Sequence, residues 1–249
     1  MRYFLELSFD GTDFHGWQRQ PNAPSVQQHL EEAMSLLLAC AIEVVAAGRT
    51  DAGVHADQMV VHFDSESVID SADLLHRLNR FLPASIAIHD MFAVSAEAHA
   101  RFDALSRRYC YRISTVKNPF NDRYAWQLNH PLDLDLMNEA AAFLLGTQDF
   151  ECFSKAHTDV KTFICTVTHA AFEKKANEIH FEIQADRFLR NMVRAIVGTL
   201  VEVGMHKRSA ESMVQLIASK SRAQAGVSVP AKGLSLVAIE YPDLRLNAS

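Results

Sequence analysis

The stretch from Ile42 to Phe63 reads IEVVAAGRTDAGVHADQMVVHF, with an apolar run on each side of a polar loop. The runs Ile42–Ala47 and Met59–Phe63 predict two strands, because β-branched and apolar residues fit a pleated, buried surface. The first part of the loop, Gly48–His55, holds one carboxylate, Asp51, with a glycine three residues before it and another two residues after it. Glycine lets the backbone turn sharply, so this loop can project Asp51 from between the strands.

The first half of the chain surrounds this loop with a regular series of elements. Ser25 predicts a helix start, with Gln28 three positions later as in a capping box. A second helix begins at Asp70 or Ser71 and ends before Pro83. With strands at Tyr3–Phe9 and Ser85–Val94, the predicted order is β-α-β-β-α-β.

The second half predicts the same order of elements. The predicted strands and helices are Arg108–Val116, a helix from Asp135 to Gly146, Thr162–Phe172, Glu178–Ala185, helices from Phe188 to Gly204 and from Ser209 to Ser219, and Leu236–Glu240. These series predict an α+β fold of two similar halves, with antiparallel sheets side by side and helices on one face. We expect the halves to cover residues 1–104 and 105–249, to form one continuous catalytic unit, and to hold a ligand in the cleft between them.

The composition is that of an ordinary globular protein, with 49% hydrophobic and 22% charged residues in 249. No apolar run approaches the roughly 20 residues that a membrane helix needs, and the first residues read as a strand instead of a targeting signal. We therefore expect a cytoplasmic protein with reduced cysteines. A zinc site of Cys152, His157, Cys165 and His169 is disfavoured, because its spacing lacks the tight ligand pairs of structural zinc.

The net charge of −6 argues at first against a nucleic-acid partner. Two segments are nevertheless basic: residues 98–112, and the run Arg187, Arg190 and Arg194. The spacing of that run predicts one face of a helix. These patches predict either local phosphate binding or simply solvated surfaces, and the charge does not choose between the two.

Several carboxylate chemistries can be compared at Asp51. An aspartate on such a loop is most often a turn residue, but Arg49 nearby would help to keep it ionised, so that it could act as a nucleophile or as an orienting base. Phosphoryl transfer through magnesium needs further oxygen ligands, and a glycosidase needs a second, paired carboxylate. The sequence contains no Walker loop, no dinucleotide-binding fingerprint and no Gly-x-Ser-x-Gly.

Five blocks in this sequence resemble the TruA family of tRNA pseudouridine synthases. The catalytic signature of that family is similar to the loop that begins at Gly48. The blocks, in chain order, are Asp10-Gly11 with Gly16-Trp17-Gln18-Arg19-Gln20; Gly48-Arg49-Thr50-Asp51-Ala52-Gly53-Val54-His55-Ala56; Ala98-His99-Ala100-Arg101-Phe102 with Arg107-Arg108-Tyr109-Cys110-Tyr111; Phe188-Leu189-Arg190-Asn191-Met192-Val193-Arg194 with Ile196-Val197-Gly198; and Lys232-Gly233-Leu234.

The resemblance implies a role for individual residues. Asp51 matches the nucleophile, Arg49 an arginine that guides the target nucleotide, Tyr109 the tyrosine that stacks on uracil, and Arg194 the basic partner of the aspartate. A further set matches stretches that contact tRNA: Arg19, His99, Arg101, Phe102, Arg107, Arg108, Lys161 and Arg190. The implied enzyme is a homodimer without metal or other cofactor, which isomerises uridine to pseudouridine in the anticodon arm at about positions 38 to 40.

Some features depart from this picture or allow another. Asp57 stands where many relatives have glycine, and the segment His157–Lys161 matches only loosely. From strand parity alone, Tyr109 is more often a core residue, and His55 is more often structural than a ligand. The alternative functions are a non-catalytic tRNA-binding module or chaperone of the same fold, and a small-molecule hydrolase that uses Asp51.

Overall fold

The protein folds into two compact units, described separately below. The computed structural model describes residues 1–155 and 160–245. The first unit comprises Met1–Leu105 together with the segment that begins at Leu236, and the second comprises Ser106–Ser235. We expected the residues from Leu236 onward to complete the second half, but their contacts place them in the first unit.

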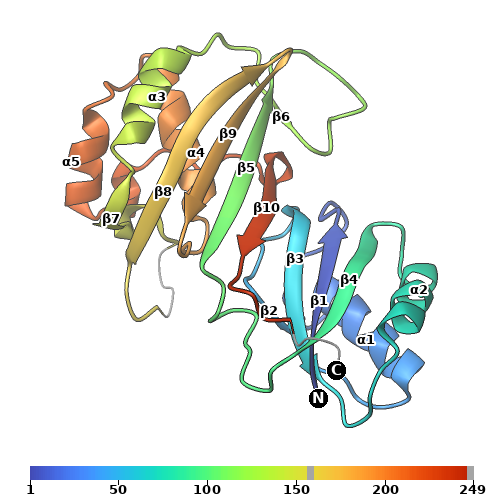
Figure 1. Ribbon diagram of the computed structural model, residues 1–249. Coiled ribbons are helices and arrows are strands. Elements are labelled where there is room, and N and C mark those ends of the chain that lie inside the picture. The colour runs from blue at the N-terminus through green and yellow to red at the C-terminus, as the bar shows by residue number, and fades with distance from the viewer. Residues whose placement is uncertain (156–159, 246–249) are drawn as a thin grey trace. The chain divides into compact units, whose positions relative to one another are not determined.

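In the first unit, a sheet of antiparallel pairs is covered by two helices. The strand order is β4-β1-β3-β10, with the short β2 paired to β3. The helices α1 and α2 lie on the same side of these strands (Figure 1). The bounds are β1 Arg2–Phe9, α1 Val26–Leu38, β2 Val45–Ala46, β3 His55–Asp64, α2 Ser71–Phe81, β4 Ile86–Val94 and β10 Leu234–Glu240.

Side-chain capping and alternation explain why these elements form where they do. Ser25 accepts a hydrogen bond from the backbone nitrogen of Gln28 at the start of α1, and Asp70 accepts two from the first turn of α2. The apolar stripe of α1 is buried, and Leu5 and Leu7 of β1 are fully buried. The predicted β-α-β-β-α-β order is therefore confirmed in this unit, although the first strand of the central pair is shorter than Ile42–Ala47.

In the second unit, the strand order is β5-β9-β8-β7, with β6 paired in parallel to β5 and the remaining pairs antiparallel. The helices α3, α4 and α5 gather on one side of these strands (Figure 1). The bounds are β5 Ser106–Ser114, β6 Trp126–Gln127, α3 Leu134–Ala142, β7 Gly146–Asp149, β8 Ile164–Lys175, β9 Glu178–Ala185, α4 Met192–Gly204 and α5 Ser212–Ser219. Short 3-10 helices η1, η2 and η3 span Glu151–Phe153, Arg222–Gln224 and Ala231–Gly233.

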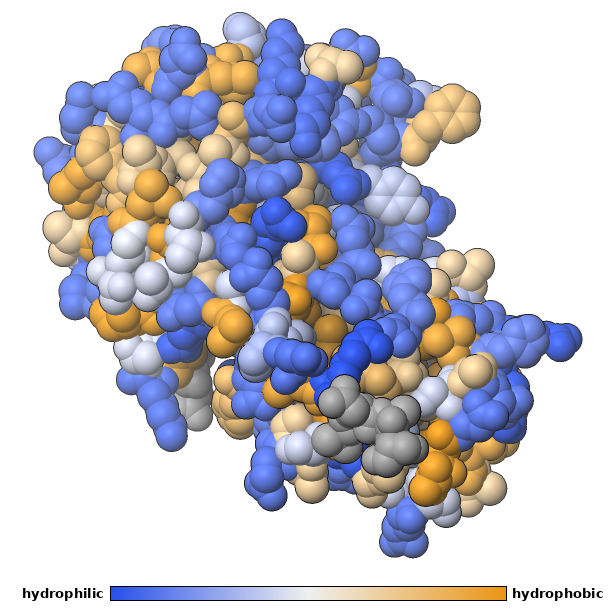
Figure 2. All heavy atoms as spheres, viewed as in Figure 1, coloured by the Kyte–Doolittle hydropathy of each residue, from blue (hydrophilic) through white to orange (hydrophobic). Residues whose placement is uncertain are grey.

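The core of this unit lies between the sheet and α4, most of whose residues are buried. Strand β9 has the predicted bounds, and Phe181 and Ile183 on its inward face are fully buried. The predicted α+β fold of antiparallel strands and helices is confirmed. Figure 2 shows hydrophobic residues that reach the surface over α3 and α5. Val214 of α5 is exposed.

The structure corrects the start of one predicted helix. The helix expected from Phe188 begins only at Met192, because Asn191 adopts a left-handed conformation with φ of 67° and breaks the helix there. Arg187 and Arg190 therefore lie on the connection that precedes α4, and Arg194 alone of the three is helical. The expected single helical face of three arginines is wrong.

Candidate active site

The loop that carries Asp51 connects β2 to β3 and is tightly folded. The backbone nitrogen of Val54 donates to the carbonyl oxygen of Asp51 at 3.1 Å, and Gly53 has a φ of 74°, a conformation that glycine adopts without strain. Asp51 is half-buried, whereas Arg49 is exposed. The structure thus presents the carboxylate from a compact turn, as the two glycines predicted.

A second turn, residues 10–17, clamps this loop by backbone contacts. The nitrogen of Trp17 donates to the carbonyl of Thr50 at 3.2 Å, and the nitrogen of Gly53 donates to the carbonyl of Phe14 at 3.3 Å. At Gly16, a Cβ would lie 2.5 Å from the carbonyl oxygen of Thr50, and at Gly11 a Cβ would lie 2.0 Å from that of Val54. The two turns can pack this closely only because both positions are glycine.

Buried side chains complete the clamp. His55 is 3% exposed, and its Nδ1 accepts a hydrogen bond of 3.1 Å from the backbone nitrogen of Gly11. Trp17 and Phe14 are buried as well, and the Trp17 ring lies 6.0 Å from that of Phe9. The structural role expected for His55 is confirmed, and Trp17 and Phe14 help to anchor the same turn.

Thr50, the residue before Asp51, contains the one buried side-chain oxygen or nitrogen, among those of the described residues, that has no hydrogen-bond partner. The residue is 8% exposed. A buried hydroxyl without a partner is destabilising by about 1–3 kcal/mol. Such groups are uncommon in proteins and are often found where function requires them.

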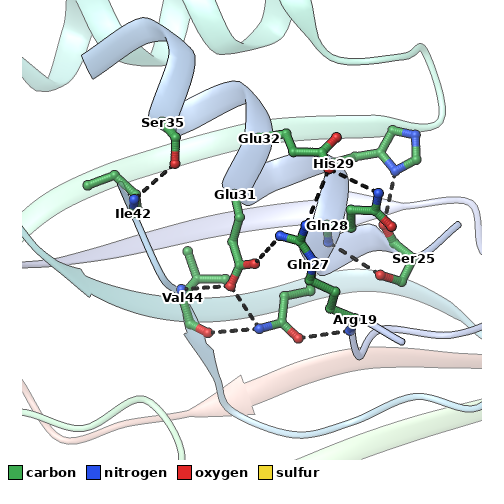
Figure 3. Close-up of polar contacts among 10 residues, drawn as sticks. All are labelled: Arg19, Ser25, Gln27, Gln28, His29, Glu31, Glu32, Ser35, Ile42 and Val44. Carbon is green, nitrogen blue, oxygen red and sulfur yellow. Dashed lines mark hydrogen bonds and ion pairs between the residues drawn. The ribbon is translucent and has the colours of Figure 1, made fainter. Parts of the chain in front are cut away.

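Arg19, predicted to contact RNA, takes part in a polar network that joins three segments (Figure 3). Its guanidinium lies 3.4 Å from Glu31 and 3.6 Å from Glu32, both on α1. Glu31 is nearly buried and also accepts hydrogen bonds from the side chain of Gln27 and the backbone nitrogen of Val44. Any contact of Arg19 with a phosphate would therefore be shared with these two carboxylates.

The turn after β4 holds three predicted RNA contacts together. His99 lies 4.2 Å from the Phe102 ring, and the Arg101 guanidinium lies 5.7 Å from the centre of that ring. Phe102 is 73% exposed, and Arg101 is exposed. An exposed aromatic ring next to a cation is a suitable surface for a nucleobase.

The buried His62 supports this turn from β3. Its Nδ1 accepts a hydrogen bond from the backbone nitrogen of Ala100 at 3.1 Å, and its ring packs edge-on against His99 at 4.6 Å. Burial, together with nearby Arg2 and His99, lowers the pKa of His62 to about 4. His62 is therefore neutral at pH 7 and has a structural role, since it holds the backbone of this turn.

In the second unit, Tyr109 lies within β5. It pairs with Ile183 of β9, is half-buried, and packs edge-on against Phe188 at 5.0 Å. Its strand neighbour Tyr111 is fully buried, donates through its hydroxyl to the carbonyl of Pro230, and has a pKa raised by burial. Tyr111 is thus a core residue, whereas part of the Tyr109 ring reaches the surface.

Arg194 lies in the first turn of α4 and is oriented by the loop before β10. Its Nε donates to the carbonyl of Val229 at 2.7 Å. Among the other predicted cations of this unit, Arg108, Lys161 and Arg190 are exposed. Arg107 donates to the carbonyl of Asp186 at 2.8 Å. Most of the segment His157–Lys161 lies outside the described residues.

The predicted site residues are thus divided between the two units. The first unit holds Arg19, Arg49, Asp51, His99, Arg101 and Phe102, and the second holds Arg107, Arg108, Tyr109, Lys161, Arg190 and Arg194. The sequence analysis missed Glu31 and Thr50. An acidic residue directly after the buried Leu30 of α1 was the available signal for Glu31, but nothing in the sequence marked the buried hydroxyl of Thr50.

The described part of the chain contains no group of three or more histidine, cysteine or acidic side chains arranged to hold a metal ion. Of the residues considered for zinc, Cys152 and Cys165 are buried thiols whose pKa burial raises to about 12, and His157 lies outside the described residues. Within the same ranges, no helix has the length and apolar character to span a membrane. A cavity in the first unit is lined in part by Glu6, Gln58 and Tyr241, and contains none of the predicted site residues.

Comparison with known proteins shows to which family the chain belongs. The family model described as tRNA pseudouridine synthase matches residues 7–103 and 140–242. The chain belongs to the tRNA pseudouridine synthase family. The matched ranges include the aspartate loop, its clamp and Arg194.

Individual members of this family are similar over nearly the whole chain. A tRNA pseudouridine synthase A of Bacteroides thetaiotaomicron is 51% identical over 97% of this chain and 91% of its own. One from Bacteroides fragilis is also 51% identical, over 97% of this chain and 96% of its own. One from Acetivibrio thermocellus is 40% identical, over 95% and 98%. The predicted enzyme class, a pseudouridine synthase that acts on tRNA, is confirmed.

Proposed function

We propose that this enzyme isomerises uridine to pseudouridine in the anticodon arm of tRNA, with Asp51 as the nucleophile. The observation that carries the assignment to Asp51 is the clamp on its loop. Two glycine contacts and three backbone hydrogen bonds fix the backbone on both sides of this carboxylate. A group that makes a bond must be held close to its productive geometry by a rigid surround, which this frame supplies.

The reaction that we propose detaches uracil from its ribose, turns it, and rejoins it through carbon instead of nitrogen. The target uridine must first leave the base stack, at a cost of a few kcal/mol. Stacking on Tyr109, worth about 1–3 kcal/mol, and phosphate contacts from the arginines would offset that cost. Asp51 would then attack the anomeric carbon or the uracil ring, or assist the loss of a sugar proton, and the three alternatives stay open.

The remaining residues have distinct proposed roles. Arg49 guides the nucleotide, and Arg194 is the basic partner of the Asp51 carboxylate, as the resemblance to the family implies. An arginine beside a desolvated carboxylate is favourable, because either charge alone would be costly to bury. Arg101 and Phe102, with the other exposed cations, contact the tRNA outside the reacting nucleotide.

The test replaces Asp51 with asparagine, which is nearly isosteric. Asp51→Asn should bind a tRNA transcript with the normal Kd but form no pseudouridine, whereas the matched change Asp57→Asn, at an exposed carboxylate in β3, should stay active. Product formation is followed by carbodiimide-stop primer extension or nucleoside chromatography, because uridine and pseudouridine have the same mass. Normal turnover by Asp51→Asn would rule out the nucleophile assignment.

The same assays separate the alternatives. A non-catalytic binding module would bind tRNA without turnover in the wild-type protein, and a hydrolase would act on free glycosides without RNA. The affinity for tRNA should fall steeply with salt, since phosphate contacts release counterions. The homodimer and the cytoplasmic location stay predictions. Sedimentation of the full chain with and without tRNA tests the dimer.

A further inference from the structure

Arg222 lies in η2 and donates three hydrogen bonds to the loop that follows it. Its Nη1 lies 3.1 Å from the carbonyl oxygen of Gly226 and 3.5 Å from that of Ala225, and its Nη2 lies 2.9 Å from the hydroxyl of Ser228. The guanidinium is partly buried in these contacts. A planar fork of donors can hold several acceptors at fixed angles, which a lysine ammonium cannot do.

Ser228 links this loop to the residue that precedes α4. Its hydroxyl also accepts a hydrogen bond of 2.6 Å from the side chain of Asn191, the left-handed residue at the start of the helix. The hydroxyl of Ser228 therefore joins Arg222 to Asn191, three residues before Arg194. The start of α4 and the loop are connected through one oxygen atom.

The loop also packs directly on the backbone of α4. At Gly198, a Cβ would lie 1.9 Å from the carbonyl oxygen of Val227, so only glycine permits this approach. The nitrogen of Gly226 donates to the hydroxyl of Thr199 at 2.9 Å. These contacts leave the loop little freedom to shift along the helix.

The loop contacts Arg194 through Val229, and two hydrogen bonds join Val229 to Arg194. Arg194 Nε donates to the Val229 carbonyl at 2.7 Å, and the Val229 nitrogen donates to the Arg194 carbonyl at 3.3 Å. Because the first bond uses Nε, it sets the direction in which the outer two nitrogens of the guanidinium point. The position of the Val229 carbonyl therefore fixes the orientation of the Arg194 side chain.

We propose that Arg222 is a positioning residue that orients Arg194 through the loop 225–229. The proposal rests on the role of Arg194 in the proposed function. Arg222 fixes the carbonyls and the hydroxyl at one end of the loop, and Val229 at the other end fixes the guanidinium of Arg194. A displacement of about 1 Å at a reacting group can lower a rate by about 100-fold, so a residue that holds the loop affects turnover without touching substrate.

The first test compares Arg222→Met and Arg222→Lys with Arg208→Met. Arg208 is a matched control, because it also contacts α4, through an ion pair with Glu202 near the other end of that helix. Both Arg222 variants should lower the single-turnover rate at saturating tRNA by about 10- to 100-fold while the Kd for tRNA stays within about twofold. Arg208→Met should keep the wild-type rate. Should Arg222→Met fail to fold, Ser228→Ala removes the shared acceptor and should lower the rate in the same way.

The second test is a double-mutant cycle with Arg194→Lys. If Arg222 acts through Arg194, Arg222→Met should have little further effect on the rate in the Arg194→Lys background. Additive effects, or a wild-type rate in the folded Arg222 variants, overturn the positioning role and leave the role of Arg194 intact. A wild-type rate in Arg194→Lys alone removes the role of Arg194, and with it this proposal.

Discussion

Gly16 is held against Thr50, so that a Cβ on residue 16 would lie 2.5 Å from the Thr50 carbonyl oxygen. The φ of Gly16, +93°, is one that residues with a side chain rarely adopt. The turn that precedes α1 therefore packs closely enough to fix the conformation of the aspartate loop. The first prediction follows from this contact.

Gly16→Ala should displace the aspartate loop and abolish most of the turnover, with a lower Tm. An alanine held at this φ should by itself lower the free energy of unfolding by about 1–2 kcal/mol. The collision of its Cβ with the Thr50 carbonyl oxygen lowers it further. Gly146→Ala is the control, because Gly146 has the same φ of +93° but no atom within 4 Å of its Cβ position. Equal loss of turnover in the two variants would show that the contact with Thr50 is unimportant.

Glu31→Ala should destabilise the first unit through the loss of a buried acceptor. Without the carboxylate, the buried backbone nitrogen of Val44 loses its partner, at a cost of about 1–3 kcal/mol. Glu32→Ala removes only exposed contacts, an ion pair with Arg19 and a hydrogen bond from the Gln28 side chain, and should change the free energy of unfolding by less than about 1 kcal/mol. Urea denaturation monitored by circular dichroism measures both, and the prediction fails if the two variants have the same midpoint.

Phe102→Ala should weaken tRNA binding and leave folding unchanged. Because the ring is 73% exposed, little packing is lost, whereas a stacked base would contribute about 1–3 kcal/mol. The Kd should therefore rise by about 5- to 150-fold with the same Tm. Phe81→Ala, at a phenylalanine of α2 that is 53% exposed, is the control and should bind normally. An unchanged Kd in Phe102→Ala would exclude the ring from the RNA interface.

Stability should fall as the pH is lowered from about 6.5 to about 4, because His62 stays neutral in the folded state. Burial lowers its pKa to about 4, whereas in the unfolded chain the pKa is about 6.5. Between these values, the unfolded state binds a proton that the folded state does not, so stability is lost as the pH falls. One such proton gives a slope of at most about 1.4 kcal/mol per pH unit.

His62→Asn tests this assignment, since an amide oxygen can still accept the hydrogen bond from Ala100 and cannot titrate. The free energy of unfolding of the variant should depend less on pH between 4 and 6.5. His99, whose pKa burial also lowers, adds to the slope that remains. Asp64, with a pKa lowered chiefly by its hydrogen bond to Arg2, contributes only at more acid pH. Identical pH profiles for wild type and variant would contradict the prediction.

The elements with strong local signals could be predicted from the sequence. The alternation in Glu178–Ala185 gave the bounds of β9, and Asp70 marked the start of α2 as a capping residue. The start of α4 could not be predicted in the same way. Leu189 is buried, so it continues the apolar periodicity of the helix, while the left-handed Asn191 interrupts the backbone. The spacing of apolar residues shows which side chains are buried. Here the buried side chains continue before Met192, where the backbone is not helical.

In the candidate site, too, some features could be predicted from local sequence and others could not. The glycines around Asp51, and the resemblance of its loop to a known signature, marked this carboxylate as the candidate nucleophile. The reason for Gly11 and Gly16 lies in contacts with residues about 35 to 45 positions later, which no local pattern encodes. The link from Arg222 to Arg194 likewise depends on a loop that packs on a helix. The candidate nucleophile could thus be predicted from its neighbours in the sequence. The residues that hold it and Arg194 in place could be found only in the tertiary structure.

The return of β10 to the first unit affects the order in which the protein can fold on the ribosome. The nitrogen of Leu105 donates to the carbonyl of Glu240, and Gln58 accepts a hydrogen bond from the nitrogen of Ile239. The first sheet thus lacks a strand until everything from Ser106 to Ser235 has been translated, a delay on the order of ten seconds. During that interval, the part of β3 that the short β2 does not cover is an unprotected sheet edge in the nascent chain, and a chaperone would be most useful there.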